Sequence, residues 1–366
     1  MKITHVTTRV LDTLDETPLV PDLPQPAEHV GPRQLLTVQL ATDDGVAGLG
    51  VTFWHGALSA ALKAALDALA ALTVGEDPRS LEAIASKLRG ATGRTSANGS
   101  AIFNMAFAAI DMACWDIKAR LANQSLCAYL GGARDRVPAY ASGALLRGFA
   151  LDDMQRTACR LVDMGFRQLK LQCGAEPASE SIERVRALRE TVGASIELMC
   201  DVNQLWSVHH AIDVGRQLEP YRLSWIEDPT VPEDYPGLAR IAAALDTPVT
   251  AGEYCVGMWP FRHLLEARAM DILMIDLMRV GGISAWLKVA ALAQAFNVPV
   301  VSHLLPEIHV QLVAAVPNGL TVEYRPLTHG IFEQTPLLEN GALLVPDRPG
   351  LGLTLSKEAI ARYQVA

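Results

Sequence analysis

Short apolar runs and amphipathic segments alternate along the chain from about residue 135 onward. Each apolar run stops at a polar or charged residue, about 20 to 30 positions after the end of the previous run. The runs end near Ser142, Gln172, Asp201, Glu227, Glu253, Asp276, His303 and Glu323. Parallel strands need a crossover segment that returns the chain, so eight runs with seven helical segments between them predict a (β/α)7β barrel over residues 133–325.

The first part of the chain has a different pattern. Alternating positions indicate strands there, and apolar spacings of three and four indicate helices. The expected elements are strands over residues 1–10 and 34–53, the latter interrupted by a turn at Asp43-Asp44-Gly45, and helices over 57–73, 78–90 and 99–121. We therefore predict an α+β domain over residues 1–132. Residues 326–366 are rich in proline and glycine, and we expect them to pack back on that domain.

Composition narrows the class of protein. The 366 residues are 50% hydrophobic and 19% charged, which is typical of a folded chain. The net charge is −9 without a basic stripe, which argues against a nucleic-acid partner. No apolar run approaches the roughly 20 residues of a membrane span, and Met1-Lys2-Ile3-Thr4-His5 does not resemble the start of a signal peptide. We predict a soluble, cytoplasmic protein with no membrane partner.

Six cysteines are scattered along the chain without a CxxC spacing. They are Cys114, Cys127, Cys159, Cys173, Cys200 and Cys255. Most lie in apolar stretches, so we expect reduced, buried thiols and neither a zinc site nor a disulfide framework.

Three consecutive strand ends carry carboxylates: Asp201, Glu227 and Glu253. Neighbouring strands lie about 4.8 Å apart, so three acids at one barrel mouth cannot all stay ionised without a cation. Oxygen ligands favour a hard ion, and we predict that these residues hold one Mg²⁺ per subunit. The alternative is that each acid caps a helix or forms a salt bridge. For a single acid this alternative is the better interpretation. For three acids in register the metal site is the better one.

The remaining strand ends carry a candidate base. Asp276 and His303 end neighbouring strands, and a carboxylate beside an imidazole fixes its tautomer and raises its basicity. Lys170, on the second strand, and Glu323, on the eighth, are expected to lie near each other at the mouth. Glu323 could hydrogen-bond a substrate oxygen or form an ion pair with Lys170, and the sequence leaves both open. Ser142, at the end of the first strand, is a further candidate for substrate contact.

Four stretches, together with these strand ends, carry a resemblance to a known family. They are Ala109-Ile110-Asp111-Met112-Ala113-Cys114-Trp115-Asp116, Leu130-Gly131-Gly132, Ile275-Asp276-Leu277-Met278-Arg279-Val280-Gly281-Gly282 and Ser302-His303-Leu304. The chain resembles the mandelate racemase subgroup of the enolase superfamily over essentially its whole length. The resemblance implies a modified TIM-type barrel under an N-terminal capping domain that the C-terminal segment completes. It also implies an even-numbered homo-oligomer, such as an octamer.

The resemblance further implies a role for each strand-end residue. The three acids would hold Mg²⁺, and Lys170 would add positive charge at the carboxylate of a small-molecule substrate. His303, oriented by Asp276, would remove the proton α to that carboxylate and give an enediolate. Glu323, in its protonated form, would hydrogen-bond the second carboxylate oxygen.

One position departs from the family pattern. Members of the subgroup often carry Lys-x-Lys on the second strand, whereas this chain has Leu169-Lys170-Leu171-Gln172. Glutamine cannot take a proton, so the site has one strong base and simple two-base racemisation is not favoured. We predict dehydration of an acid sugar, an aldonate or an aldarate, to a 2-keto-3-deoxy acid, since one histidine can act first as base and then as acid.

Two alternatives stay open. One is an isomerase of the same subgroup: a racemase, an epimerase or a cycloisomerase of a lactone or anhydro-acid. The other is a metal-binding barrel without catalysis, which only Gln172 motivates.

The cap is expected to close the mouth and choose the substrate, partly through the proline-rich loop 17–32. The candidates for substrate contact are Ser142, Gln172 and Asn203 in the barrel and His29, His55 and Arg94 in the cap. His309, which follows a Pro-Glu helix start, is interpreted as a packing residue.

Overall fold

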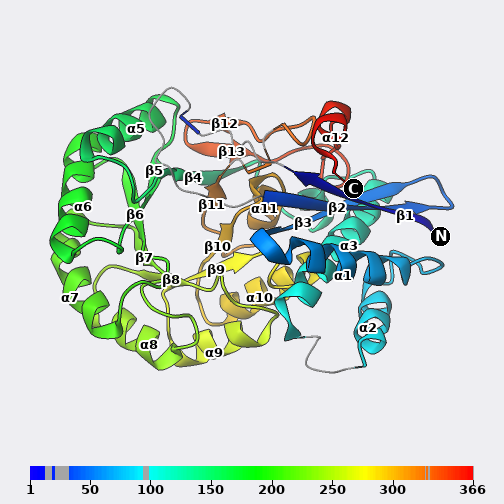
Figure 1. The fold of residues 1–366 in the computed structure, drawn as a ribbon, viewed down its shortest axis with the longest axis horizontal. Helices are drawn as coiled ribbons and strands as arrows, with labels where there is room; N and C mark the ends of the chain where they lie inside the picture. The colour runs from blue at the N-terminus through cyan, green and yellow to red at the C-terminus, as the bar shows by residue number, and fades with distance from the viewer. Residues whose placement is uncertain (13–18, 21–32, 94–98, 326, 329, 366) are drawn as a thin grey trace.

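The structure is a computed structural model that describes residues 1–12, 19–20, 33–93, 99–325, 327–328 and 330–365. His29 and Arg94 lie outside these ranges, as does most of loop 17–32. Figure 1 shows a ring of strands and helices on one side and a smaller sheet with helices on the other, where both ends of the chain lie. Within the described ranges, no helix combines the length and apolar character that a membrane span needs.

Eight strands form the barrel, in the order that the sequence predicts. They are β4 (Arg136–Leu145), β5 (Gln168–Gln172), β6 (Glu197–Asp201), β7 (Trp225–Glu227), β8 (Val249–Ala251), β9 (Ile272–Asp276), β10 (Val300–His303) and β11 (Val322–Tyr324). Strands β4 to β10 pair in parallel with their sequence neighbours, and β11 pairs in parallel with β4. A parallel bridge between Val300 and Gly319, just before β11, closes the ring.

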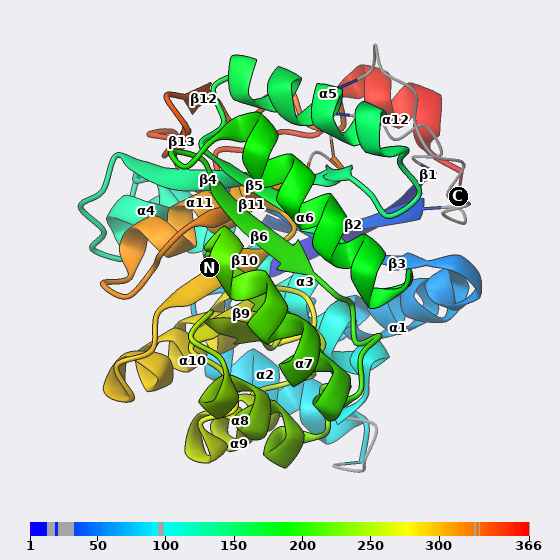
Figure 2. The same cartoon turned by 90° about the vertical axis from the view of Figure 1, so that its left-hand side faces the viewer.

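Seven helices alternate with these strands, as predicted, and cover the outside of the ring (Figure 2). They are α5 (Leu151–Asp163), α6 (Ala178–Val192), α7 (Val208–Leu218), α8 (Tyr235–Ala244), α9 (Trp259–Ala267), α10 (Ile283–Ala295) and α11 (Pro306–Ala315). A 3₁₀ turn, η3 (Glu219–Tyr221), follows α7. The fold class expected from the alternation is therefore confirmed. The division at residues 132 and 325 remains a proposal, which the bounds of β4 and β11 support.

The inside of the barrel is packed with side chains. Tyr140, Trp225 and Met274 belong to a buried cluster there, and the rings of Tyr140 and Trp225 meet edge to face with centroids 5.3 Å apart. Because large side chains fill the interior, substrate has access only at an end of the ring. In barrels of this type, that end is the one where the strands terminate.

The N-terminal sheet has three antiparallel strands: β1 (Ile3–Asp12), β2 (Arg33–Thr42) and β3 (Ala47–His55). Four helices and the 3₁₀ turn η1 (Gly56–Leu58) follow it. The helices are α1 (Ser59–Ala71), α2 (Leu81–Ala91), α3 (Ala101–Leu121) and α4 (Leu126–Tyr129). The turn predicted at Asp43-Asp44-Gly45 joins β2 to β3, and Gly45 has a φ of 78°, which favours glycine.

Helix α3 packs directly against β3. A Cβ atom on Gly50 would lie 1.7 Å from the carbonyl oxygen of Ala109, and one on Gly48 would lie 2.1 Å from that of Ala113. The close approach of the two backbones therefore requires glycine at both positions.

The C-terminal segment returns to the N-terminal domain, as predicted. It contains β12 (Leu338–Glu339), β13 (Ala342–Leu344), which pairs antiparallel with β4, and α12 (Lys357–Tyr363). Gln364 forms an antiparallel bridge with Leu11 of β1. Asp116 of α3 is buried and joins the segments, because its Oδ2 accepts from Leu49 N at 2.9 Å and its Oδ1 accepts from Leu351 N at 2.7 Å.

Candidate active site

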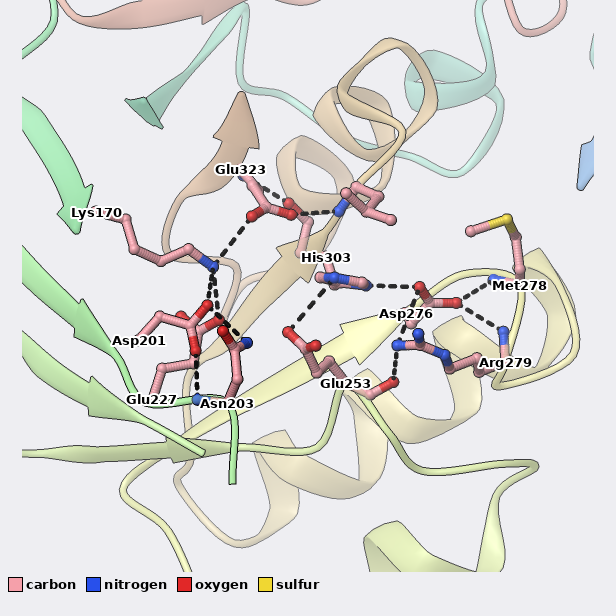
Figure 3. Close-up of polar contacts among 12 residues, drawn as sticks. Lys170, Asp201, Asn203, Glu227, Glu253, Asp276, Met278, Arg279, His303 and Glu323 are labelled. Atoms are coloured by element: carbon pink, nitrogen blue, oxygen red, sulfur yellow. Dashed lines mark hydrogen bonds and ion pairs between the residues drawn. The ribbon is translucent and has the colours of Figure 1, made fainter. Parts of the chain in front are cut away.

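The strand-end residues singled out in the sequence converge on the barrel mouth (Figure 3). Lys170, Asp201, Asp276 and His303 lie on β5, β6, β9 and β10. Glu227 ends β7, Glu253 follows β8, and Glu323 lies on β11. All of these side chains are buried. Because the strands are parallel, each one delivers its last residue to the same end of the ring.

Lys170 lies at the centre of a ring of carboxylates. Its Nζ lies 2.6 Å from Glu227 Oε1, 3.1 Å from Glu323 Oε1 and 3.7 Å from Asp201 Oδ2. Burial alone would lower the pKa of Lys170, but the charges of Glu227 and Glu323 outweigh it and hold this pKa well above its ordinary value. The lysine is therefore a fixed cation at the mouth.

The acids at the mouth outnumber this cation. Burial raises the pKa of Glu227 well above its ordinary value and also raises the pKa of Asp201. Ligand oxygens of Glu227, Asp228 and Glu253 all lie within 4.8 Å of one another. Since buried carboxylates this close repel each other when ionised, the cluster favours a bound cation.

Asp228 is a member of this cluster that the sequence analysis missed. It directly follows Glu227, and a positive φ of 42° turns the chain so that both neighbours face the mouth. Its Oδ2 is buried and has no hydrogen-bond partner among the described residues. An orphaned carboxylate oxygen beside two further acids fits a hard divalent ion. The signal was the adjacent acid pair in Ile226-Glu227-Asp228-Pro229.

On the other side of the mouth, His303 and Asp276 form the expected pair. His303 Nδ1 lies 2.6 Å from Asp276 Oδ2, so the proton sits on Nδ1 and Nε2 faces the mouth. Asp276 Oδ1 accepts from the backbone N–H groups of Met278 at 2.9 Å and Arg279 at 2.7 Å. Burial alone would raise the pKa of Asp276, but the Arg279 charge and the bond to His303 lower it. The carboxylate therefore stays ionised.

His303 is also close to the carboxylate cluster. Its Nε2 lies 3.4 Å from Glu253 Oε2. Burial alone would lower the pKa of His303, but the charge of Glu253 and the bond to Asp276 raise it. The imidazole is thus made more basic, and it is in direct electrostatic contact with the acids that could hold a metal ion.

The surroundings of Glu323 favour its ionised form over the protonated form expected from the resemblance. Burial alone would raise the pKa of Glu323, but Lys170 and His303 outweigh it and hold the pKa well below its ordinary range. Its Oε2 also accepts from the backbone N–H of Leu304 at 2.6 Å. Of the two options left open by the sequence, the structure shows the ion pair with Lys170, at 3.1 Å.

The candidates for substrate contact are placed unevenly. Asn203 donates to Asp201 Oδ2 at 3.0 Å and accepts from Arg147 Nη2 at 2.6 Å, so it is engaged in orienting the acid. Arg147, in the loop after β4, was missed because it lies beyond the strand end.

The other candidates for substrate contact have fewer recorded partners. Ser142 is buried and hydrogen-bonds Glu323. Gln172 is half-buried, at the position of β5 that pairs with Asp201. His55 ends β3, but its side chain is outside what the structure describes.

One expectation about the cysteines is wrong. Cys173 and Cys200 form a disulfide, with their Cα atoms 6.6 Å apart across a sequence separation of 27. Neighbouring parallel strands bring the two together, because Cys173 follows β5 and Cys200 is the fourth residue of β6. The other four cysteines are free; three are buried, as predicted, and Cys159 is exposed.

Comparison with known proteins gives a family for this architecture. Residues 15–131 match the model of the mandelate racemase/muconate lactonizing enzyme N-terminal domain, and residues 153–359 match that of the enolase C-terminal domain-like fold. The chain belongs to the mandelate racemase/muconate lactonizing enzyme family. Its place in the enolase superfamily, expected from the strand-end motifs, is confirmed.

Relatives within the family differ in the reaction for which they are named. L-talarate/galactarate dehydratase of Salmonella typhimurium is 33% identical over 325 residues, which cover 89% of this chain and 81% of that protein. The 3,6-anhydro-alpha-L-galactonate cycloisomerase of Streptomyces coelicolor is 33% identical over 335 residues, which cover 91% of this chain and 92% of that protein.

A solved structure of the family superposes over the whole chain. L-talarate dehydratase from Polaromonas sp. JS666, crystallised with Mg and L-glucarate, has a TM-score of 0.92 and 33% identity. The match covers 100% of this chain and 98% of that chain. The cap and barrel described above are therefore shared with an acid-sugar enzyme.

Proposed function

We propose that the protein is a Mg²⁺-dependent hydro-lyase that dehydrates an acid sugar, an aldonate or an aldarate, to a 2-keto-3-deoxy acid. The observation that carries this proposal is the His303–Asp276 pair, 2.6 Å apart, facing Lys170 across a cluster of buried carboxylates. A basic imidazole opposite a fixed cation is the arrangement needed to remove a proton α to a carboxylate. The named acid-sugar dehydratases among the relatives support the choice of substrate class.

Asp201, Glu227 and Glu253 are proposed to hold the ion. The oxygens of Glu227 and Glu253 form the close cluster with Asp228, which is an additional candidate acid. When bound, Mg²⁺ supplies positive charge beside the substrate carboxylate, which stabilises the charge that develops as the α-proton leaves. Lys170 is proposed to contribute positive charge to the same carboxylate. Its contacts with Glu227 and Glu323 place the ammonium group within the mouth.

His303 is proposed to take the α-proton on Nε2, while Asp276 keeps the other ring proton on Nδ1. The protonated imidazole then returns its proton to the 3-hydroxyl group, which leaves as water. The resulting enol becomes the 2-keto-3-deoxy acid. Gln172 cannot take a proton, so it is proposed to orient substrate, and all proton transfers occur on the face of His303.

A cycloisomerase is the second candidate, and the Streptomyces coelicolor relative favours it specifically. The same proton abstraction would then open an anhydro ring or a lactone without losing water. The even-numbered homo-oligomer and the cytoplasmic location stay predictions.

Purified protein with Mg²⁺ should be incubated in D₂O with a panel of aldonic, aldaric and anhydro-aldonic acids and followed by NMR. Dehydration predicts a 2-keto-3-deoxy product with loss of water. Cycloisomerisation predicts an isomer of unchanged composition. The matched control is His303→Asn, which keeps a polar side chain but lacks the basic nitrogen at the position of Nε2. Neither product nor α-deuterium across the panel would refute both candidates and favour a barrel without catalysis.

A further inference from the structure

The chain makes an unusual turn immediately after His303. Leu304 has a φ of 58° and Leu305 a φ of 44°, so two consecutive leucines occupy the left-handed region. Residues with a Cβ atom rarely adopt this conformation, and it is costly for bulky side chains. Such a turn persists only where neighbouring groups hold it in place.

Two hydrogen bonds from different elements hold the backbone of Leu304. Its N–H donates to Glu323 Oε2 of β11 at 2.6 Å, and its carbonyl oxygen lies 2.6 Å from His309 Nδ1 of α11. The Leu304 N–H belongs to the peptide bond that directly follows His303. The Leu304 carbonyl belongs to the next peptide bond, so the two hydrogen bonds together hold both peptides of the turn that follows His303.

His309 has the chemistry of a fixed hydrogen-bond donor. A carbonyl oxygen can only accept, so the proton of His309 lies on Nδ1. The ring is fully buried against Trp286, with centroids 6.1 Å apart. Burial lowers the pKa of His309 to about 4, which keeps the ring neutral at neutral pH.

A packing role does not account for a histidine at this position. The Nε2 atom of His309 is buried without a hydrogen-bond partner among the described residues, which is unfavourable compared with an apolar ring of similar size. The one hydrogen bond that the structure records for its side chain is the bond to Leu304 O. By contrast Gln311, also buried on α11, joins α11 to Cys127 N and Leu351 O.

We propose that His309 is a positioning residue for the base: by donating Nδ1–H to the Leu304 carbonyl, it fixes the left-handed turn that directs His303 toward Asp276. The inference rests on the proposed role of His303 in proton abstraction. Among the described residues, no hydrogen bond or ion pair joins the His309 side chain to the acids at the mouth, although the charges of Asp276, His303 and Glu323 act on it. It acts together with Glu323, which holds the N–H of the same residue.

Three substitutions of His309 distinguish the effect of its hydrogen-bond donor from the effect of its ring. His309→Phe keeps a ring and removes the donor. His309→Asn places an amide nitrogen, two bonds from Cβ, where Nδ1 lies, and so retains the donor without the ring. His309→Gln moves the donor one bond further, to the position of Nε2.

We expect His309→Phe to lower kcat by about 10- to 100-fold with KM changed less than about threefold, because misplacement of a reacting group by an ångström has an effect of this size. His309→Asn is expected to stay within about threefold of the unmodified protein. A loss that is equal in His309→Phe and His309→Asn, or an unchanged kcat in His309→Phe, would overturn the proposal. If His309→Phe does not fold, His309→Gln replaces it with the same expectation.

A second measurement is independent of turnover. In protein labelled with ¹⁵N-histidine, we expect the proton in the 2.6 Å contact between His303 and Asp276 to give a downfield signal, which His303→Asn assigns by its loss. We expect this signal to shift or broaden in His309→Phe and to remain in His309→Asn. An unchanged signal in His309→Phe overturns the proposal. If the unmodified protein turns over no acid sugar, the proposed function fails, and this signal still decides the role of His309.

Discussion

The two halves of the barrel mouth are built in different ways. On the half formed by β5 to β8, oxygens of Glu227, Asp228 and Glu253 lie within 4.8 Å of one another, and Lys170 contacts Glu227. Asp201 accepts from the Asn203 N–H, but Asp228 Oδ2 has no hydrogen-bond partner among the described residues. On the half formed by β9 to β11, each carboxylate is held by backbone donors. Two N–H groups donate to Asp276, and Leu304 N–H donates to Glu323.

The two buried aspartates show what this difference does. Burial raises the pKa of Asp228 well above its ordinary value, whereas the pKa of Asp276 is lowered, because Arg279 and His303 outweigh burial there. Fixed backbone dipoles need no ion in order to stabilise a charge. We call the β9–β11 side of the mouth the base half and the β5–β8 side the acid half. We infer that the base half is organised before metal binds, and that the acid half is completed by the metal.

The largest effect is expected for the base itself. His303→Asn should lower α-proton exchange by about 10⁴-fold, because the proton acceptor is removed. Mg²⁺ affinity, measured by titration calorimetry, should stay within about threefold. Asp276→Asn is the matched variant and should lower exchange less, since the imidazole remains. Loss of Mg²⁺ binding in His303→Asn would contradict the separation of the two halves.

The acid half should respond in the opposite way. Glu227→Gln is expected to weaken Mg²⁺ binding by about 100-fold or more, because a carboxylate that is proposed to ligate the ion is replaced by a neutral amide. The downfield proton signal of the His303–Asp276 pair should persist in this variant. Its disappearance would mean that the base half depends on the acid half, and the comparison would fail.

The metal-free protein should lose stability as the pH rises above the ordinary carboxyl pKa of about 4. Glu227 and Asp228 have folded-state pKa values raised above their ordinary values, so the stability linked to their protons is present at low pH and is lost as pH rises toward the raised values. The raised pKa of His303 acts in the same direction above about 6.5. We expect Tm to fall by about 2 °C per pH unit for each proton released.

Saturating Mg²⁺ is expected to flatten this pH dependence, because the ion replaces the protons of the acids. Scanning calorimetry with EDTA and with Mg²⁺ makes the comparison. Glu227→Gln should also reduce the slope of Tm against pH that is measured in EDTA. A metal-free Tm that rises with pH across this range would show that the acids are not protonated in the folded state.

The smallest effect is expected at Gln172. Gln172→Lys restores a second proton acceptor at the end of β5, and slow exchange on the opposite face should become detectable by NMR. Dehydration should change by less than about tenfold. Gln172→Met, which has a similar length and no basic group, is the control. Racemisation by the unmodified protein would refute the one-base interpretation.

Much of this arrangement could be predicted because parallel barrel strands are apolar throughout. A charged residue such as Asp201 or His303 at the end of such a strand interrupts the pattern, and topology places it at the mouth. The eight strand ends expected from the sequence lie within three residues of those in the structure.

What could not be predicted depends on backbone conformation and on the sum of charges. Asp228 faces the mouth only because its φ is 42°, and the sequence pattern allots one inward residue to each strand end. Arg147 lies beyond a strand end, and its contact with Asn203 depends on the path of a loop. The ionised state of Glu323 follows from the distances to Lys170 and Leu304 N–H, which periodicity does not provide.

The cap is assembled from both ends of the chain, and this has a consequence for biosynthesis. Asp116 receives the N–H of Leu351, and Leu11 of the first strand bridges Gln364. A ribosome therefore completes all eight barrel strands before it delivers the partners of the first strand and of α3. The cap therefore cannot finish folding until the whole barrel has been synthesised. Until then the edge of β1 is exposed and is a place where a chaperone could act.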